Sequence, residues 1–371
     1  MKRFWKNAYA IVLAILCAAS FAGAAYFAYV NLGAAGLWAC IAGGALSLVF
    51  APLFHELGHI VFAKINGFYV VLWKIFILRY DFTGEKRRVR LCSPFAAEQT
   101  QAAAKRAYAD MKKRAAAYTA GGLIFGGAFF LIVAILALVF SLAGAGAAYA
   151  VSYAFFGALP YAAYLLLLNL PPFEYAGGKT DMRVLCDILK DKPCGVRFCA
   201  AMNAQGELAG GKPYSKIDRA YLENLPAIAE DEPLFAMNEF YLYFAAAETR
   251  DYESAAKHIN RIAALSPYLT DEERRAALCE LTYLNAILGD ETQAEKCFAA
   301  LCGDSGTAEI LQTSAGNRAA AAYYVMRGDF SSAARRVEIA ETAARKEKFS
   351  GAAESEKLLL QPIIEELGEG A

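Results

Sequence analysis

The chain has 371 residues, of which 57% are hydrophobic and 20% are charged. It is too apolar for an ordinary soluble protein and too charged for a bundle lying wholly in a membrane. The net charge of zero combines a basic part, residues 1–214, with an acidic part, residues 215–371, so we expect two regions with different surroundings. The nine cysteines form no C-x-x-C pair, which argues against a cysteine zinc site or a disulfide framework.

Four uncharged stretches are candidates for membrane-spanning helices, which need about 20 apolar residues. The first, residues 8–29, follows three basic residues but lacks a convincing signal-peptide cleavage site, so we interpret it as a retained anchor. The second covers residues 34–54, with Pro52 as its expected kink. Residues 115–173 carry no charge, and the small residues at 143–146 divide them into two further spans.

The positions of basic residues predict the orientation of these spans. Twelve Lys and Arg residues lie from Lys64 to Arg114, between the second and third spans, whereas the short connections at Gly33 and Gly144 contain none. Because basic loops stay cytoplasmic, we expect an integral, multi-pass protein of the cell membrane with cytoplasmic N- and C-termini.

The basic connection has features of its own. Residues 68–78 are β-branched and aromatic, Thr83-Gly84 offers a turn, and residues 86–91 offer a partner strand. These features predict a small β-hairpin at the membrane edge. Residues 100–114 are rich in Ala with spaced basic residues, which fits an interfacial helix or a plain basic loop equally well.

Residues 55–59 read His-Glu-Leu-Gly-His and hold two of the three histidines in the chain. At positions i and i+4 of a helix, His55 and His59 project from one face and can share a Zn²⁺ ion, with Glu56 placed to take a proton from water at the metal. Such short patterns also occur by chance. However, titratable groups inside a spanning helix are costly and usually mark function, so the sequence predicts a catalytic zinc site.

A catalytic zinc ion generally has three protein ligands and one open position, so another ligand has to come from elsewhere. The remaining histidine, His258, lies in the acidic part of the chain. The candidates are instead the carboxylates near the cytoplasmic end of the fourth span: Glu174, Asp181 and Asp187.

The motif at residues 55–59 resembles the first signature of the site-2 protease family of intramembrane zinc metalloproteases. Asn169-Leu170-Pro171-Pro172, followed by Asp181, resembles the second signature. In that family the aspartate is the third zinc ligand, and the asparagine contacts the substrate or the transition state. The resemblance therefore implies that Asp181 is a metal ligand and that Asn169 is a catalytic polar contact.

The second signature departs from the family pattern in two ways. The gap between Pro172 and Asp181 is longer than usual, and Met182 stands where a glycine is expected. The other two carboxylates therefore stay open as alternatives. Gly122 and Gly126, on the third span, resemble a glycine pattern on the family's middle core helix.

The acidic part contains three similar segments, each between two helical stretches. Their aspartates recur every 39 residues, at Asp251, Asp290 and Asp329. A helix, a tight turn and a second helix at a regular period resemble tetratricopeptide-like repeats, although the period is longer than the common one. Such repeats would dock a protein partner or the cytoplasmic tail of a substrate, and the alternative is a plain helical domain. The negative charge argues against nucleic acid.

Taken together, the sequence predicts a mainly α fold: a polytopic membrane helix bundle at residues 1–190, a linker at 191–214 and a soluble helical repeat domain at 215–371. The predicted function is hydrolysis of peptide bonds in or near transmembrane segments, with a transmembrane protein as substrate and the lipid bilayer as surroundings. One alternative is a catalytically inactive scaffold of the same fold, which has no need of Glu56. Another is an ion-coupled transporter, which would more often show two corresponding halves.

Overall fold

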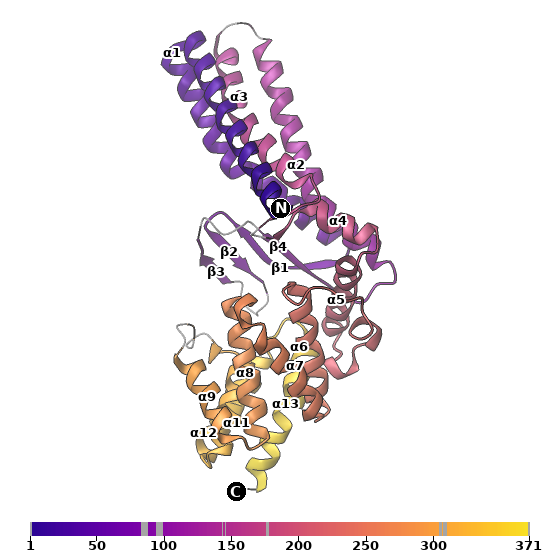
Figure 1. Cartoon of the computed structure of the whole chain (residues 1–371). Helices are drawn as coiled ribbons and strands as arrows, with labels where there is room; N and C mark the ends of the chain where they lie inside the picture. Colours follow the sequence, from indigo (N-terminus) through magenta and orange to yellow (C-terminus); the bar gives the residue numbers. More distant parts are fainter. Residues whose placement is uncertain are drawn as a thin grey trace. The chain divides into compact units, whose positions relative to one another are not determined.

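The computed structural model describes residues 2–82, 88–93, 99–142, 144, 146–175, 178–303, 306 and 310–369. These residues form twelve α-helices and two small β-sheets. The fold is mainly helical (Figure 1). The chain divides into two compact units. The first contains Met1–Phe82, Arg87–Ala103 and Asp110–Gly195, and the second contains mainly Val196–Ala371.

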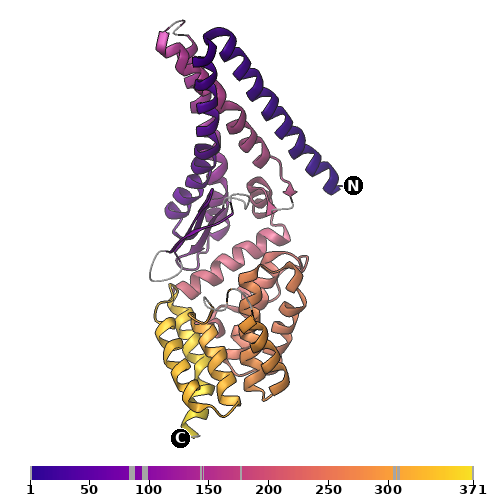
Figure 2. The same cartoon turned by 90° about the vertical axis from the view of Figure 1, so that its left-hand side faces the viewer.

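Three helices of the first unit are long and apolar enough to cross a membrane: α1 (Lys2–Ile65), α2 (Met111–Ser141) and α3 (Gly146–Asn169). A straight helix of the 64 residues of α1 would be about 96 Å long, some three times the hydrocarbon thickness of a bilayer. Gly33, with a φ of 61°, interrupts α1 at a kink, and α1 folds back on itself (Figure 2). Glycine suits this position because it adopts positive φ without strain.

Close packing of small residues holds α1 against α3. A Cβ atom on Gly157 would overlap the carbonyl oxygen of Cys40, so a larger residue at 157 would push the helices apart. Next to this contact, the buried hydroxyl of Ser47 donates a hydrogen bond to the carbonyl of Ala158, at 2.8 Å. Small residues and short polar contacts of this kind are typical of helices that associate in a membrane.

The predicted β-hairpin is part of a larger sheet with the strand order β3-β2-β1-β4. Its strands are β1 (Phe68–Ile75), β2 (Leu78–Asp81), β3 (Arg88–Leu91) and β4 (Gln99–Ala104). The predicted pairing of residues 68–78 with 86–91 is wrong, because β2 lies between β1 and β3 and is antiparallel to both. The chain turns back early, at Phe76, whose φ is 51°. The predicted turn at Thr83-Gly84 lies outside the described residues.

The interfacial helix predicted for residues 100–114 is also wrong, and so is the alternative of a plain loop. β4 occupies the first part of this stretch, and α2 begins only at Met111. The Ala-rich segment has a high intrinsic helix propensity, but propensity is a weak local preference, and backbone pairing with β1 overrides it.

After α3 the chain forms two very short strands, β5 (Glu174–Tyr175) and β6 (Gly178–Lys179), and then α4 (Asp181–Leu189) and α5 (Pro193–Ala209). The stretch predicted as a linker, residues 191–214, is therefore helical for most of its length. Pro193 suits the first turn of a helix. A Cβ atom on Gly195 would overlap the carbonyl of Asp187, so α5 begins tightly packed against α4.

In the second unit, the three predicted turns each join two consecutive helices. The pairs are α6 (Pro233–Glu248) with α7 (Tyr252–Ala264), α8 (Asp271–Ile287) with α9 (Glu291–Gly303), and α11 (Ser314–Met326) with α12 (Phe330–Ala344). In each turn the recurring aspartate accepts a hydrogen bond from the backbone N–H three residues later, at 3.0 to 3.1 Å. The aspartates thus recur because each one caps the start of a helix. A last helix, α13 (Ser350–Glu369), follows.

A fully buried arginine lies in the core of the second unit. Arg318 pairs with Glu280 at 2.8 Å and with Glu356 at 2.9 Å, and its guanidinium group lies 4.5 Å from the ring centre of Tyr283. The hydroxyl of Tyr243 donates a further hydrogen bond to Glu280, at 2.9 Å. These contacts join α6, α8, α11 and α13. Removing one partner of such a buried ion pair is costly.

Replacing Arg318 with methionine leaves two buried carboxylates without their cation. We expect the free energy of unfolding to fall by about 3–5 kcal/mol, as measured by chemical denaturation of the full chain in detergent followed by circular dichroism. Arg250→Met is the matched control, because the Arg250–Glu365 pair is about half exposed on both sides and should contribute no more than about 1 kcal/mol. Equal effects of the two substitutions would contradict the buried role of Arg318.

Candidate metal centre

His55, His59 and Asp181 meet at one point of the first unit. The Nε2 atoms of His55 and His59 lie 3.0 and 3.2 Å from the same oxygen, Oδ2 of Asp181. Both histidines are buried, each with 7% of its surface exposed. One ligand atom from each residue lies within 4.8 Å of the others, which is close enough for the three to share one metal ion.

The helix α1 places the two histidines one turn apart on a single face, and their rings meet edge to face with centres 5.2 Å apart. A separate segment delivers the aspartate. Thr180 caps α4 by accepting a hydrogen bond from the N–H of Arg183, at 3.2 Å, and its hydroxyl donates to the carbonyl of Pro171, at 2.8 Å. Asp181 is therefore the first residue of a capped helix that is tied to the end of α3.

The long gap before Asp181 has a structural explanation. Its residues include the two strands β5 and β6, which pair with each other in antiparallel fashion. The N–H of Thr180 then donates to the carbonyl of Phe173, at 3.1 Å. Thr180 therefore lies beside Phe173, and the long gap still brings Asp181 back to the end of α3.

The backbone of α2 orients one of the histidines. Nδ1 of His59 lies 3.1 Å from the carbonyl oxygen of Tyr118, and this contact is attractive when Nδ1 carries the proton. In the neutral ring, Nε2 then presents a lone pair to the carboxylate oxygen of Asp181. An attractive contact between these two acceptors requires a positive charge between them, either a proton or a metal ion. Metal-ligating histidines commonly donate from the other nitrogen in this way.

Glycines on α2 leave room for the three side chains. A Cβ atom on Gly122 would lie 2.3 Å from Nε2 of His59 and 2.8 Å from both Nε2 of His55 and Oδ2 of Asp181. A Cβ atom on Gly126 would lie 3.3 Å from Nδ1 of His55. The glycine pattern noted in the sequence therefore faces the cluster directly. Nitrogen and carboxylate donors converging on such a space form a group that could hold one metal ion.

The charge state of the aspartate suits a ligand. Burial opposes the ionisation of Asp181, but the neighbouring His55 and His59 outweigh this effect and hold the pKa of the carboxyl below its ordinary value. Asp181 is therefore a carboxylate at neutral pH, which is the form that binds metal ions.

Glu56 lies beside the cluster without belonging to it. Its side chain is buried, with 5% of its surface exposed, and Oε2 accepts a hydrogen bond from the hydroxyl of Thr100 on β4, at 2.5 Å. A carboxylate next to a candidate metal centre is available to accept or donate a proton. Sequence reasoning missed Thr100, because the strand that carries it was interpreted as a helix or a loop.

The alternative carboxylates have other surroundings. Glu174 is exposed on β5. Asp187 is buried and pairs with Arg183 at 3.1 Å and Lys192 at 3.2 Å. The structure thus brings Asp181, of the three candidates, to the histidine pair.

The other predicted polar residues have local partners. Asn169 is the last residue of α3 and is half-buried, and its side-chain amide donates to the carbonyl of Leu165, at 3.2 Å. Its catalytic contact stays a prediction. His258 lies in the second unit, where its Nδ1 is 2.8 Å from a carboxylate oxygen of Glu239.

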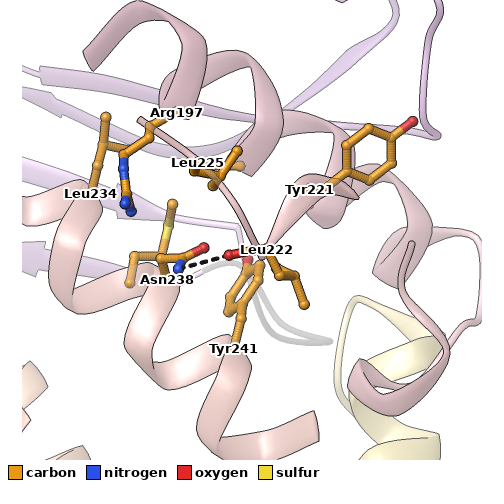
Figure 3. A pocket seen from close by; sticks show the side chains of 9 residues that line it. Arg197, Tyr221, Leu222, Leu225, Leu234, Asn238 and Tyr241 are labelled. Atoms are coloured by element: carbon orange, nitrogen blue, oxygen red, sulfur yellow. Dashed lines mark hydrogen bonds between the residues drawn. The ribbon is translucent and has the colours of Figure 1, made fainter. Parts of the chain in front are cut away.

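A small hollow in the second unit offers a different environment (Figure 3). Asn238 donates to the carbonyl of Leu222, at 3.1 Å, beside this hollow, and Arg197 donates to the carbonyl of Pro226, at 2.6 Å. The nine lining residues include no His, Cys, Asp or Glu. The hollow therefore offers no side chains of the kind that bind zinc.

Comparison of the chain with protein-family models, with curated proteins and with solved structures finds no match. The interpretation of the site therefore depends on its own geometry and on the resemblance of its motifs.

The substitution Gly122→Ala tests the space at the cluster. The added methyl group displaces the imidazole of His59 or the carboxylate of Asp181, so we expect metal affinity to fall by about 10- to 100-fold, measured by zinc titration of the purified protein. The control is Gly127→Ala on the same helix, where an added Cβ atom has no neighbour within 4 Å. Equal zinc affinity of the two variants would contradict this account.

A second pair of variants distinguishes the candidate carboxylates. Asp181→Asn removes the negative oxygen shared by His55 and His59, and zinc affinity should fall by more than the roughly 100-fold expected for a residue that only supports a ligand. Glu174→Gln should leave zinc content unchanged, because Glu174 is exposed and outside the cluster. Loss of zinc from the Glu174 variant alone would assign the third ligand to Glu174 instead.

Proposed function

We propose that this chain is an intramembrane zinc metalloprotease of the site-2 protease type, which hydrolyses peptide bonds in or near the transmembrane segments of membrane proteins. The observation that carries the proposal is the meeting of His55, His59 and Asp181 next to the buried carboxyl of Glu56, on a helix apolar enough to cross a membrane. A structural role alone gives no reason for this combination, since buried titratable groups in an apolar bundle are costly.

In this proposal His55, His59 and Asp181 hold the metal. Zinc in such a site supplies a Lewis acid that polarises a peptide carbonyl and acidifies water. Glu56 acts as the general base and then as the acid that protonates the departing amine. Asn169, at the end of α3, contributes a polar contact to the bound peptide.

The proposed topology has four spans: the two halves of α1 on either side of Gly33, and then α2 and α3. His55 and His59 lie ten and six residues before the end of α1 at Ile65, or about 15 and 9 Å along the helix axis. The site is therefore inside the membrane but near its cytoplasmic face, and the basic residues after Ile65 keep that end in the cytoplasm. The cell membrane is the proposed location.

Hydrolysis at this depth requires water and an unwound substrate. Irregular backbone at membrane depth is tolerated only where it is buried in protein or lines a water-filled cavity. The non-helical segment after α3, at Pro171 and Pro172, is proposed to be of this kind. The sheet begins at Phe68, directly after α1. An unwound substrate that adds a strand to an edge of this sheet would satisfy its freed backbone groups.

We further propose that the helix pairs of the second unit are tetratricopeptide-like repeats that dock a protein partner or the cytoplasmic tail of the substrate. Three turns with the same aspartate cap, 39 residues apart, support this interpretation. The acidic character of residues 215–371 disfavours nucleic acid as a ligand.

The main alternative is a catalytically inactive scaffold of the same fold. Glu56 argues against it, because a buried carboxyl next to the cluster costs stability and a scaffold gains nothing from it. For an ion-coupled transporter we would expect interrupted spans in two corresponding halves, which four spans with one motif do not provide.

The substitution Glu56→Gln tests the proposed function. It preserves the size of the side chain but removes the base, so zinc content should stay at one ion per chain while cleavage falls by about 10²- to 10⁴-fold. The readouts are metal analysis of the purified protein and the membrane protein that accumulates uncut in cells carrying the variant. Absence of zinc from both proteins, or an unchanged membrane proteome, would overturn the proposal.

A further inference from the structure

Thr100 connects the sheet to the candidate metal centre. It lies on β4, an edge strand, and its hydroxyl is 2.5 Å from Oε2 and 3.5 Å from the backbone carbonyl of Glu56. The short contact to Oε2 makes Glu56 the acceptor of this hydroxyl. The hydrogen bond thus comes from β4, whereas Glu56 itself lies on α1.

Tyr118, on α2, contacts both Thr100 and His59. Its hydroxyl donates to the backbone carbonyl of Thr100, at 2.6 Å, while its own carbonyl faces Nδ1 of His59, at 3.1 Å. The ring is buried, with 8% of its surface exposed, and meets the ring of Phe68 edge to face. A continuous set of hydrogen bonds thus runs from the histidine through Tyr118 and Thr100 to Glu56.

The physical effect of this arrangement is to fix the direction of a flexible group. A glutamate side chain has several rotatable bonds, and holding one carboxylate oxygen removes most of that freedom. The other oxygen, Oε1, then faces a defined direction and can accept a proton without a prior rearrangement of the side chain. Misplacement of a reacting group by about 1 Å is enough to reduce a rate by about 100-fold.

We infer that Thr100 is a positioning residue for the general base: its hydroxyl holds Oε2 of Glu56 so that the second carboxylate oxygen is directed for proton transfer, and Tyr118 holds the strand that carries Thr100. The inference deepens the proposed protease function and rests on it. It concerns a residue on a separate element, about 40 positions along the chain from the histidine motif.

Thr100→Val tests the inference, because valine has nearly the same shape and cannot donate. The substrate is the membrane protein that accumulates in Glu56→Gln cells, purified and added to the enzyme in detergent. We expect kcat to fall by about 10- to 100-fold, with KM and zinc content unchanged. Thr100→Ser retains the hydroxyl and should restore kcat to within a few-fold of wild type.

Thr119→Val is the matched control. Thr119 is buried on α2 next to Tyr118, but its hydroxyl donates to Ala115 of its own helix, at 3.0 Å, so wild-type kcat is expected. Wild-type kcat in Thr100→Val, a loss of zinc from that variant, or failure of Thr100→Ser to restore the rate would each overturn the inference. In these three cases Glu56→Gln still tests the proposed function separately.

Tyr118→Phe tests the second part of the inference. Without its hydroxyl, the strand that carries Thr100 is less firmly held, so kcat should fall, but by less than in Thr100→Val. Combined with Thr100→Val, the change should cause no additional loss, because both act through the same hydrogen bond to Glu56. Additive losses would show that Tyr118 acts independently of Thr100 and would overturn this part.

Discussion

The arrangement of the first unit depends on one constraint: buried polar groups within apolar helices need partners. His55, Glu56 and His59 lie within two turns of a mainly apolar helix, and none of them is more than 7% exposed. Leaving such groups unpaired inside an apolar helix bundle is costly. One carboxylate oxygen of Asp181 contacts both imidazoles, and the Thr100 hydroxyl supplies a donor to the glutamate.

Several features of the surrounding backbone follow from that constraint. Gly122 is needed on α2 because a Cβ atom there would overlap the imidazole of His59, and a Cβ atom on Gly126 would crowd Nδ1 of His55. Thr180 caps α4 and is tied to Pro171, which fixes where the first residue of that helix lies. The candidate metal centre is thus assembled from three segments that are far apart in the sequence, and each is held by local hydrogen bonds.

In the second unit, buried charged groups also have partners, in the form of ion pairs. Glu280, Arg318 and Glu356 are spaced 38 residues apart, close to the period of the turns, and they form a buried row from α8 through α11 to α13. The recurring aspartates stabilise the start of each second helix. Regular spacing in the sequence therefore has two physical origins here, one at the turns and one in the core.

The sequence by itself determined the features that depend on local chemistry. Composition located the apolar helices, the i, i+4 spacing put His55 and His59 on one face, and the Asp caps marked the turns of the second unit. Only the tertiary structure decided the rest. β4 and α5 lie where a helix or loop and a linker were predicted, and the choice of Asp181 over Asp187 required the return of the chain through β5 and β6. Thr100 could not be found for the same reason. Contacts between residues far apart in the sequence decide which strands pair and which side chains meet at the metal centre. Their free energies exceed the weak local propensities that a sequence pattern reports.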